Sequence, residues 1–213
     1  MELNAVKIYQ RHNNKIALKI IPGHFATSHS HINYYIDMTT LKIRQQEAAD
    51  IAREMAADYV STTIIDTIIC MDGCEVIGAF LAEELTKAGI MSINSHKSIY
   101  VVTPEYNTDN QLIFRDNIQP SITGKHILLL LASATTGKTI EKSLECISYY
   151  QGQIAGISAI FSAVDQVDQI PVHSVFSPAD LPNYVTYDYT SCPYCRAGQK
   201  LDAIVNSYGY SRL

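Results

Sequence analysis

Residues 126–139 read HILLLLASATTGKT, an apolar run that leads through small hydroxylic residues to a single glycine and a lysine. The run predicts a buried strand over 126–131, and the pattern that follows predicts a helix over about 137–150. A strand, a short polar loop and a helix in this order turn backbone N–H groups and the positive helix end toward one point. The loop therefore predicts a phosphate site, although a capped helix start without a ligand fits the same residues.

Strand and helix patterns alternate on both sides of this segment. Further helices are indicated at 42–59 and 76–87, and further strands at 64–70, 98–103, 153–161 and 172–176. This alternation predicts an α/β fold, with a mostly parallel, twisted sheet flanked by helices. We expect a single domain over 1–213, made of an N-terminal hood segment (1–40), an α/β core (41–176) and an irregular C-terminal tail (177–213).

The composition is that of a globular chain able to bury a full core, since 47% of the 213 residues are hydrophobic and 17% are charged. The net charge is −5 and no basic block is present, so nucleic acid is not an expected partner. No run has the roughly 20 apolar residues of a membrane span, and the first residues lack the apolar segment of a secretory signal.

The cysteines number five, which indicates reduced thiols and a cytoplasmic location. The 14 tyrosines suggest either an aromatic surface packed against a second copy or part of the core of the cap that the chain ends form, and a homodimer is expected.

Two interpretations of the phosphate loop compete. Residues 132–139 fit A-x-x-x-x-G-K-T, a Walker A pattern with alanine in place of its first glycine. A nucleotide hydrolase usually carries this loop after its first strand, whereas here it lies beyond the middle of the chain. No clear Walker B carboxylate follows an apolar strand, so this interpretation is the weaker one.

The second interpretation rests on a resemblance that covers nearly the whole chain. Residues 127–145, ILLLLASATTGKTIEKSLE, resemble the phosphoribosyl-diphosphate (PRPP) motif of the type I phosphoribosyltransferases. Residues 64–85, IIDTIICMDGCEVIGAFLAEEL, resemble the strand, turn and helix that contact the diphosphate in that family. The segments GHFATSHSHINYYID (23–37) and CPYCRAG (192–198) resemble parts of orotate phosphoribosyltransferases.

This resemblance implies transfer of ribose 5-phosphate from PRPP to a nucleobase such as orotate, with Mg²⁺ and release of diphosphate, a step of pyrimidine biosynthesis. The implied ligand is thus a small phosphoribosyl molecule. The implied phosphate-binding residues are Ser133, Ala134, Thr135, Thr136, Gly137, Lys138 and Thr139. The turn that faces the diphosphate or metal would be Asp72, Gly73, Cys74 and Glu75. The base would be held by Phe25, Ser28, His31, Tyr35 and Asp37.

Departures from the family pattern leave the activity open. Leu131 and Ala132 stand where the family carries the two acidic residues that hold the ribose hydroxyls. The region 97–119 offers Lys97 and Arg115 but no basic cluster. The sequence is therefore compatible with a transferase that uses an unusual ribose site. The alternative, which the missing acidic pair supports, is a catalytically inactive regulatory module on the same fold that binds PRPP or a nucleotide.

Cysteine and histidine residues near the two ends of the chain leave further alternatives. Cys192 and Cys195 form a C-x-x-C pair with no second pair, so a zinc site needs Cys70, Cys74, a histidine or a partner subunit. A tight turn at Pro193 with reduced thiols is the simpler interpretation. His29 and His31 alternate along an expected strand, which argues against joint ligation. The family resemblance implies that His31 contacts base or phosphate, and a position in a solvated loop is the alternative.

Overall fold

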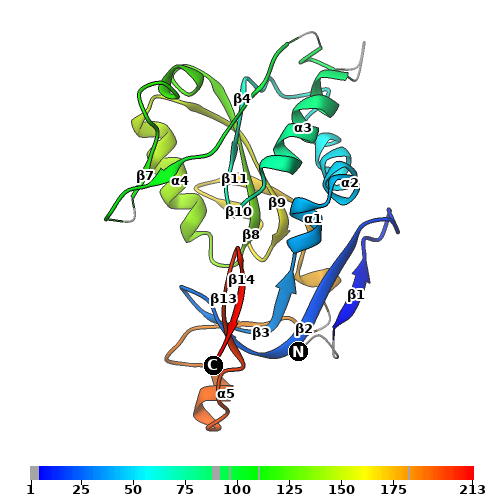
Figure 1. Cartoon of the computed structure of the whole chain (residues 1–213), viewed down its shortest axis with the longest axis vertical. Coiled ribbons are helices and arrows are strands. Elements are labelled where there is room, and N and C mark those ends of the chain that lie inside the picture. The colour runs from blue at the N-terminus through cyan, green and yellow to red at the C-terminus, as the bar shows by residue number, and fades with distance from the viewer. Residues whose placement is uncertain (1–4, 88–91, 96, 110, 182) are drawn as a thin grey trace.

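The structure is a computed structural model, and it describes residues 5–87, 92–95, 97–109, 111–181 and 183–213. The chain forms an α/β core and a smaller β-sheet that lies against one end of it (Figure 1). No helix in these ranges is long and apolar enough to cross a membrane.

The core sheet has the strand order β10-β11-β9-β8-β4-β5. Five of its strands run parallel, and β10 pairs antiparallel with β11 at the edge. Its strands are β4 (Thr67–Cys70), β5 (Tyr100–Val102), β8 (His126–Ala134), β9 (Gln153–Ser162), β10 (Gln166–Val167) and β11 (Ile170–Phe176). The predicted α/β class with a mostly parallel sheet is therefore confirmed.

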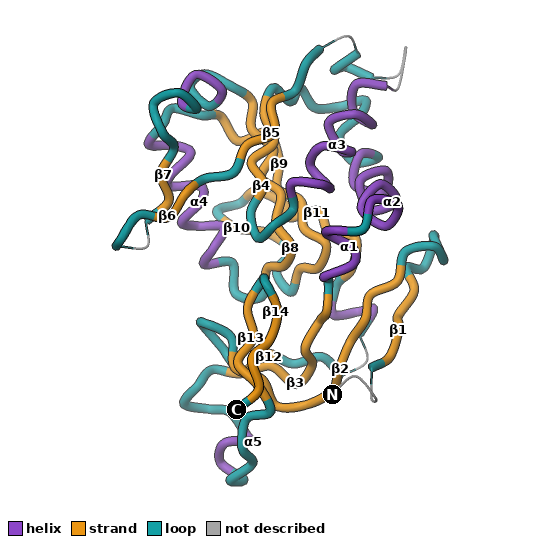
Figure 2. Tube along the Cα trace, viewed as in Figure 1, coloured by secondary structure: helices purple, strands orange, loops and turns teal. Residues whose placement is uncertain are grey.

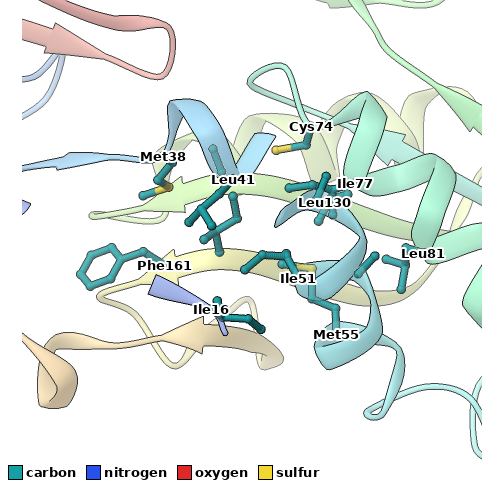
Figure 3. Packing of buried hydrophobic residues seen from close by; sticks show 14 of the residues in the cluster. Ile16, Met38, Leu41, Ile51, Met55, Cys74, Ile77, Leu81, Leu130 and Phe161 are labelled. Atoms are coloured by element: carbon teal, nitrogen blue, oxygen red, sulfur yellow. The ribbon is translucent and has the colours of Figure 1, made fainter. Parts of the chain in front are cut away.

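Helices cover both faces of this sheet. The helices α1 (Thr39–Ile43), α2 (Gln45–Ala56) and α3 (Glu75–Lys87) lie on one face, and α4 (Lys138–Tyr149) lies on the other. In β8, Leu128 and Leu130 pack in the cluster with α2 and α3, whereas Leu129 and Leu131 pack in the cluster with α4. Figure 3 shows Leu130 beside Ile77 in the first cluster. Burial on both faces explains why the strand is apolar at every position from 127 to 132.

The smaller sheet, which we call the hood sheet, has the order β12-β3-β2-β13-β14, and β1 pairs with β2 (Figure 2). Its first strands are β1 (Val6–Tyr9), β2 (Ala17–Ala26) and β3 (His31–Asp37). The tail, 177–213, supplies β12 (Thr186–Tyr187), β13 (Ala203–Asn206) and β14 (Gly209–Arg212), together with the short helix α5 (Pro193–Arg196). Because β13 runs parallel to β2, the two ends of the chain are joined in one sheet.

Two local features differ from the sequence pattern. The helix expected over 42–59 is divided at Arg44, whose extended backbone (φ −89°, ψ 117°) separates α1 from α2. Between β5 and β8, a small antiparallel hairpin forms from β6 (Glu105–Tyr106) and β7 (Leu112–Ile113). Two short 3₁₀ helices, Gln119–Ser121 and Pro178–Asp180, complete the described elements.

Candidate functional site

A cavity of about 1000 Å³ lies between the carboxyl end of β8 and the hood sheet. The loop between β8 and α4 forms one wall together with α4, and β3 forms another. The β6–β7 hairpin, the β13–β14 hairpin and the turn at Asp72 also line it. Figure 1 shows the β13–β14 hairpin reaching toward this end of β8. Ligands of open α/β sheets are bound outside the carboxyl ends of the strands, and the cavity has this position.

The predicted phosphate loop lies entirely on the cavity wall. All residues from Ser133 to Thr139 line it. Gly137 is the N-cap of α4 with φ 79°, and no side chain caps this helix start. A Cβ at Gly137 would meet Val167 at 3.0 Å, so both the backbone conformation and the space favour glycine. The structure thus brings an uncapped helix start, hydroxyl groups and Lys138 to one wall, which suits an anion.

The turn after β4 places one of its four predicted residues on the cavity. Asp72 lines the cavity, and both Asp72 (φ 59°) and Gly73 (φ 75°) have left-handed backbone conformations. Cys74 is fully buried beneath the turn. Glu75 is exposed, and its carboxylate accepts a hydrogen bond from the Thr103 hydroxyl at 3.1 Å. Glu75 also lies in the first turn of α3, where the positive end of the helix dipole favours an acidic residue whether or not a ligand binds.

Lys42 is a buried cation at this turn that the sequence pattern did not single out. Its side chain is 6% exposed, and its Nζ donates to the carbonyl oxygens of Asp72, at 2.8 Å, and of Ser207. The Asp72 carboxylate faces the Ser207 side chain and the backbone amide of Ala132. A lysine, a carboxylate and the tip of the tail hairpin are therefore held together at the edge of the cavity.

Burial sets the ionisation of the groups around this turn. Desolvation raises the pKa of Asp72 above its usual value, although Ser207, Lys42 and the Ala132 amide act in the opposite direction. Desolvation also raises the pKa of the Cys70 and Cys74 thiols. Both thiols are therefore protonated at neutral pH and do not act as nucleophiles.

Asp72→Asn is expected to stabilise the protein at pH 7. Because the pKa of Asp72 is raised in the folded state, folding favours the neutral carboxyl group, and stability is lost as pH rises from about 4 through the folded pKa. Asparagine has no charge to bury and tolerates the left-handed backbone. Urea unfolding should give a higher midpoint for the variant at pH 7 and a smaller difference at pH 3. An equal difference in urea midpoint at pH 7 and pH 3 would contradict the raised pKa of Asp72.

The residues predicted to hold a base are divided between the cavity and its surroundings. Ser28 and Tyr35 line the cavity. Phe25 is fully buried behind Tyr35, with ring centroids 6.1 Å apart. The Asp37 carboxylate accepts from the Thr39 amide and pairs with Lys19. His31 lies outside the cavity lining, beside His24, Cys192 and Cys195.

Several cavity residues had no signal in the sequence. The tail contributes Tyr184, Asn206 and Ser207, and the β6–β7 hairpin contributes Tyr106 and Gln111. These residues are far from the phosphate loop in sequence, and they belong to strands of two to four residues or to loops. Strands of that length are too short to show a reliable alternating pattern.

Leu131 and Ala132 are buried in the core rather than presented to the cavity. Leu131 is 0% exposed and packs in the α4 cluster, and Ala132 is 2% exposed and packs in the opposite cluster. Among the described residues, the carboxylates that line the cavity are those of Asp72, Asp109 and Glu145.

The basic residues near the cavity are likewise few. Lys138 and Lys142 line the cavity from α4. Arg115 is held on the outside, where Glu105 accepts two hydrogen bonds from its guanidinium at 3.0 and 2.8 Å. The positive groups available to an anion therefore come from α4, with Lys42 below the turn.

Known proteins with similar sequences and folds are phosphoribosyltransferases. The chain is 31% identical to the adenine phosphoribosyltransferase of Halothermothrix orenii over 137 residues, which are 61% of this chain and 77% of that protein. No protein-family model matches the chain.

Solved structures support the same fold. Orotate phosphoribosyltransferase from Aeropyrum pernix superposes with a TM-score of 0.53 at 19% identity, over 76% of this chain and 90% of that one. Leishmania donovani UMP synthase gives a TM-score of 0.55 at 14% identity, over 84% of this chain and 36% of that one. The sequence match together with this fold leads to one conclusion: the chain belongs to the type I phosphoribosyltransferase family.

Proposed function

We propose that this protein binds PRPP in the cavity and transfers its ribose 5-phosphate to a nucleobase such as orotate, with release of diphosphate. The observation that carries the proposal is that the phosphate loop, Asp72 and the hood residues Ser28 and Tyr35 line the same cavity. A volume of about 1000 Å³ is large enough for a sugar phosphate together with a base.

The loop 133–139 is the proposed site of the 5′-phosphate. The helix start offers backbone N–H donors, Thr135, Thr136 and Thr139 offer hydroxyl donors, and Lys138 offers a charge. The diphosphate is proposed to lie against the turn of Asp72–Glu75. Lys42 lies directly beneath this turn and contributes positive charge that the region 97–119 does not supply.

Asp72 fits the role of a ligand to a Mg²⁺ ion that arrives with the diphosphate. A carboxylate oxygen is the donor that Mg²⁺ prefers, and one or two carboxylates with substrate phosphates are its usual protein setting. When bound, the ion would offset negative charge on the leaving diphosphate. Burial raises the pKa of Asp72 because it destabilises the charged carboxylate. A cation beside Asp72 would stabilise that charge.

On the base side, we propose that Ser28 and Tyr35 contact the acceptor directly. Tyr35 is 5% exposed, and burial with the nearby Asp37 raises its pKa to about 12, so its hydroxyl stays protonated and can donate or accept. Phe25 and Asp37 shape the strands behind it. The predicted homodimer and cytoplasmic location stay predictions.

A second candidate function is that of a catalytically inactive regulatory module that binds PRPP or a nucleotide. The burial of Leu131 and Ala132 favours it, because no acidic pair reaches the ribose from the end of β8. Two hydrogen bonds from sugar hydroxyls to carboxylates are worth about 1.5–3 kcal/mol each, so their loss costs on the order of 10²–10⁴-fold in rate.

Diphosphate release from PRPP separates the two candidates. With Mg²⁺ and a panel that includes orotate and adenine, we expect release that depends on one of the bases. Asp72→Asn is expected to reduce that release by about 10- to 100-fold, since one interaction with a charged acceptor is lost. Asp58→Asn is the control and should leave the release unchanged, because Asp58 is an exposed carboxylate that pairs with His173 and does not line the cavity.

The remaining outcomes are also decisive. PRPP binding without diphosphate release for any base would exclude the transferase and support the regulatory module. A folded protein that neither binds nor cleaves PRPP would overturn the proposed function.

A further inference from the structure

A cluster of four metal-binding side chains lies outside the cavity, where the tail meets the hood sheet. His24 is in β2 and His31 is the first residue of β3. Cys192 is the N-cap of α5, and Cys195 is the third residue of that helix. One ligand atom from each of these residues lies within 4.8 Å of all the others. His24 and Cys192 are fully buried and His31 is 8% exposed, whereas Cys195 is exposed.

Four distances within the cluster are close to the edges of a tetrahedron around zinc. Zn–N bonds of about 2.05 Å and Zn–S bonds of about 2.3 Å give edges near 3.3 Å for N–N and 3.6 Å for N–S. The His24 Nε2 to His31 Nδ1 distance is 3.1 Å. The Sγ atom of Cys192 lies 3.4 Å from His24 Nε2, and that of Cys195 lies 3.7 Å from His24 Nε2 and 3.3 Å from His31 Nδ1.

The surroundings of His24 fix its ring for metal binding. Its Nδ1 lies 3.2 Å from the carbonyl oxygens of both Gln199 and Lys200, so this nitrogen carries the proton. The lone pair is then on Nε2, which points into the cluster. A histidine whose other ring nitrogen donates to a backbone carbonyl is the usual arrangement at protein zinc sites.

Hydrogen bonds alone account poorly for the same geometry. With Nδ1 protonated, His24 Nε2 is a single acceptor, yet His31 Nδ1 and both cysteine sulfurs converge on it. A neutral imidazole nitrogen offers one lone pair, which a single donor satisfies. A cation between the four atoms uses the lone pairs of all of them at once.

We propose that His24, His31, Cys192 and Cys195 bind a structural Zn²⁺ ion that fixes the tail to the hood sheet. All four positions are filled by protein, which is typical of a structural rather than a catalytic zinc site. The ion joins β2, β3 and α5, segments that are separated by as many as 171 residues, between His24 and Cys195. The proposal does not depend on which reaction the cavity performs.

The zinc site is connected to the cavity through a short piece of backbone. Next to the cluster, the His24 amide donates to the Asp202 carboxylate, and the Asp202 amide donates to the His24 carbonyl, each at 2.8 Å. β13 then runs beside β2, and the following turn brings Ser207 to Lys42 and Asp72. A metal that holds residues 192–195 therefore also positions the hairpin that lines the cavity.

Metal content is the direct test, with the full chain purified from zinc-supplemented cells without chelator. We expect one equivalent of zinc per chain by elemental analysis. Replacement by Co²⁺ should give the absorption of a tetrahedral ion with a sulfur-to-cobalt charge-transfer band. Cys195→Ser changes an exposed residue and should lose most of the metal, whereas Cys146→Ser and His29→Asn should retain it. Cys146 and His29 line the cavity and are not in the cluster.

A hydrogen-exchange measurement covers the case in which a ligand variant folds poorly. Removal of zinc from the natural chain with a chelator should increase amide exchange in 203–212 more than in β8 or β9, and returning Zn²⁺ alone should reverse it. The proposal is overturned by a folded protein that binds no zinc or cobalt, by metal that Cys195→Ser retains, or by a Cys192–Cys195 disulfide in the purified chain.

Discussion

Replacing Thr136 and Lys138 together by alanine is expected to weaken PRPP binding by about 10²- to 10⁴-fold. Both residues lie on the cavity wall, and each can donate a hydrogen bond to a charged phosphate oxygen, worth about 1.5–3 kcal/mol. Neither side chain is in the buried core, so the double variant should keep the unfolding midpoint of the natural protein. Calorimetric titration with PRPP and Mg²⁺ measures the change directly.

The chain offers a matched control for this double variant. Thr123 and Lys125 have the same spacing but lie at the other end of β8, before His126. The Thr123 hydroxyl donates only to the Tyr150 carbonyl, at 3.1 Å. Thr123→Ala with Lys125→Ala should bind PRPP as the natural chain does. Equal weakening in both double variants would show that the loop 133–139 is not the phosphate site.

Leu131→Asp is expected to lower the free energy of unfolding by at least about 3–5 kcal/mol at pH 7, the cost of an unpaired buried charge. Leu131 is 0% exposed and belongs to the core cluster that includes Leu144 and Ile147 of α4. Leu131→Met, which nearly conserves volume, should cost less than about 1.5 kcal/mol. Urea unfolding at pH 7 and at pH 4 measures both, and the deficit of the aspartate variant should shrink at the lower pH as the carboxyl group protonates.

This result matters for how the family's acidic pair is interpreted here. If the prediction holds, the pair cannot simply be restored in this chain, because the packing of β8 has adapted to apolar residues at that point. A variant with natural stability and increased transferase activity would contradict the packing argument. It would mean that residue 131 can turn its side chain toward the ribose.

The features predicted from the sequence are those that depend on neighbouring residues. The run over 127–132 is apolar at every position, since β8 is buried on both faces. The loop after it carries Gly137, whose left-handed backbone conformation at the start of α4 favours glycine. Strand, loop and helix were therefore predicted together. The parallel sheet followed from the alternation of such units.

The features that the sequence did not predict depend on contacts between distant residues. β13 pairs with β2, so the tail joins the hood sheet through partners about 180 residues apart, and a four-residue strand carries little pattern of its own. Lys42 looks like an ordinary helix residue, and only its burial beneath the Asp72 turn marks it. The break at Arg44 has no glycine or proline to signal it.

The cluster of His24, His31, Cys192 and Cys195 is an intermediate case. The cysteine pair indicated a possible zinc ligand set, but its histidines could be found only from the fold. The β2–β3 hairpin pairs His31 with Ala26, and the pairing of the two strands brings His24 and His31 side by side although they are seven residues apart. His29 lines the cavity and is not in the cluster, but it lies in the bend before β3 rather than in a strand, so the predicted alternation with His31 is not what separates the two.

The central claim is that a phosphoribosyl group binds at the loop 133–139. Titration of the natural, zinc-replete chain with PRPP and Mg²⁺, followed by amide hydrogen exchange of the complex, tests it most directly. The account predicts saturable binding of one PRPP per chain, with slower exchange in 133–139 and in the turn at Asp72. No saturable binding by a folded protein, or protection confined to other segments, would contradict it.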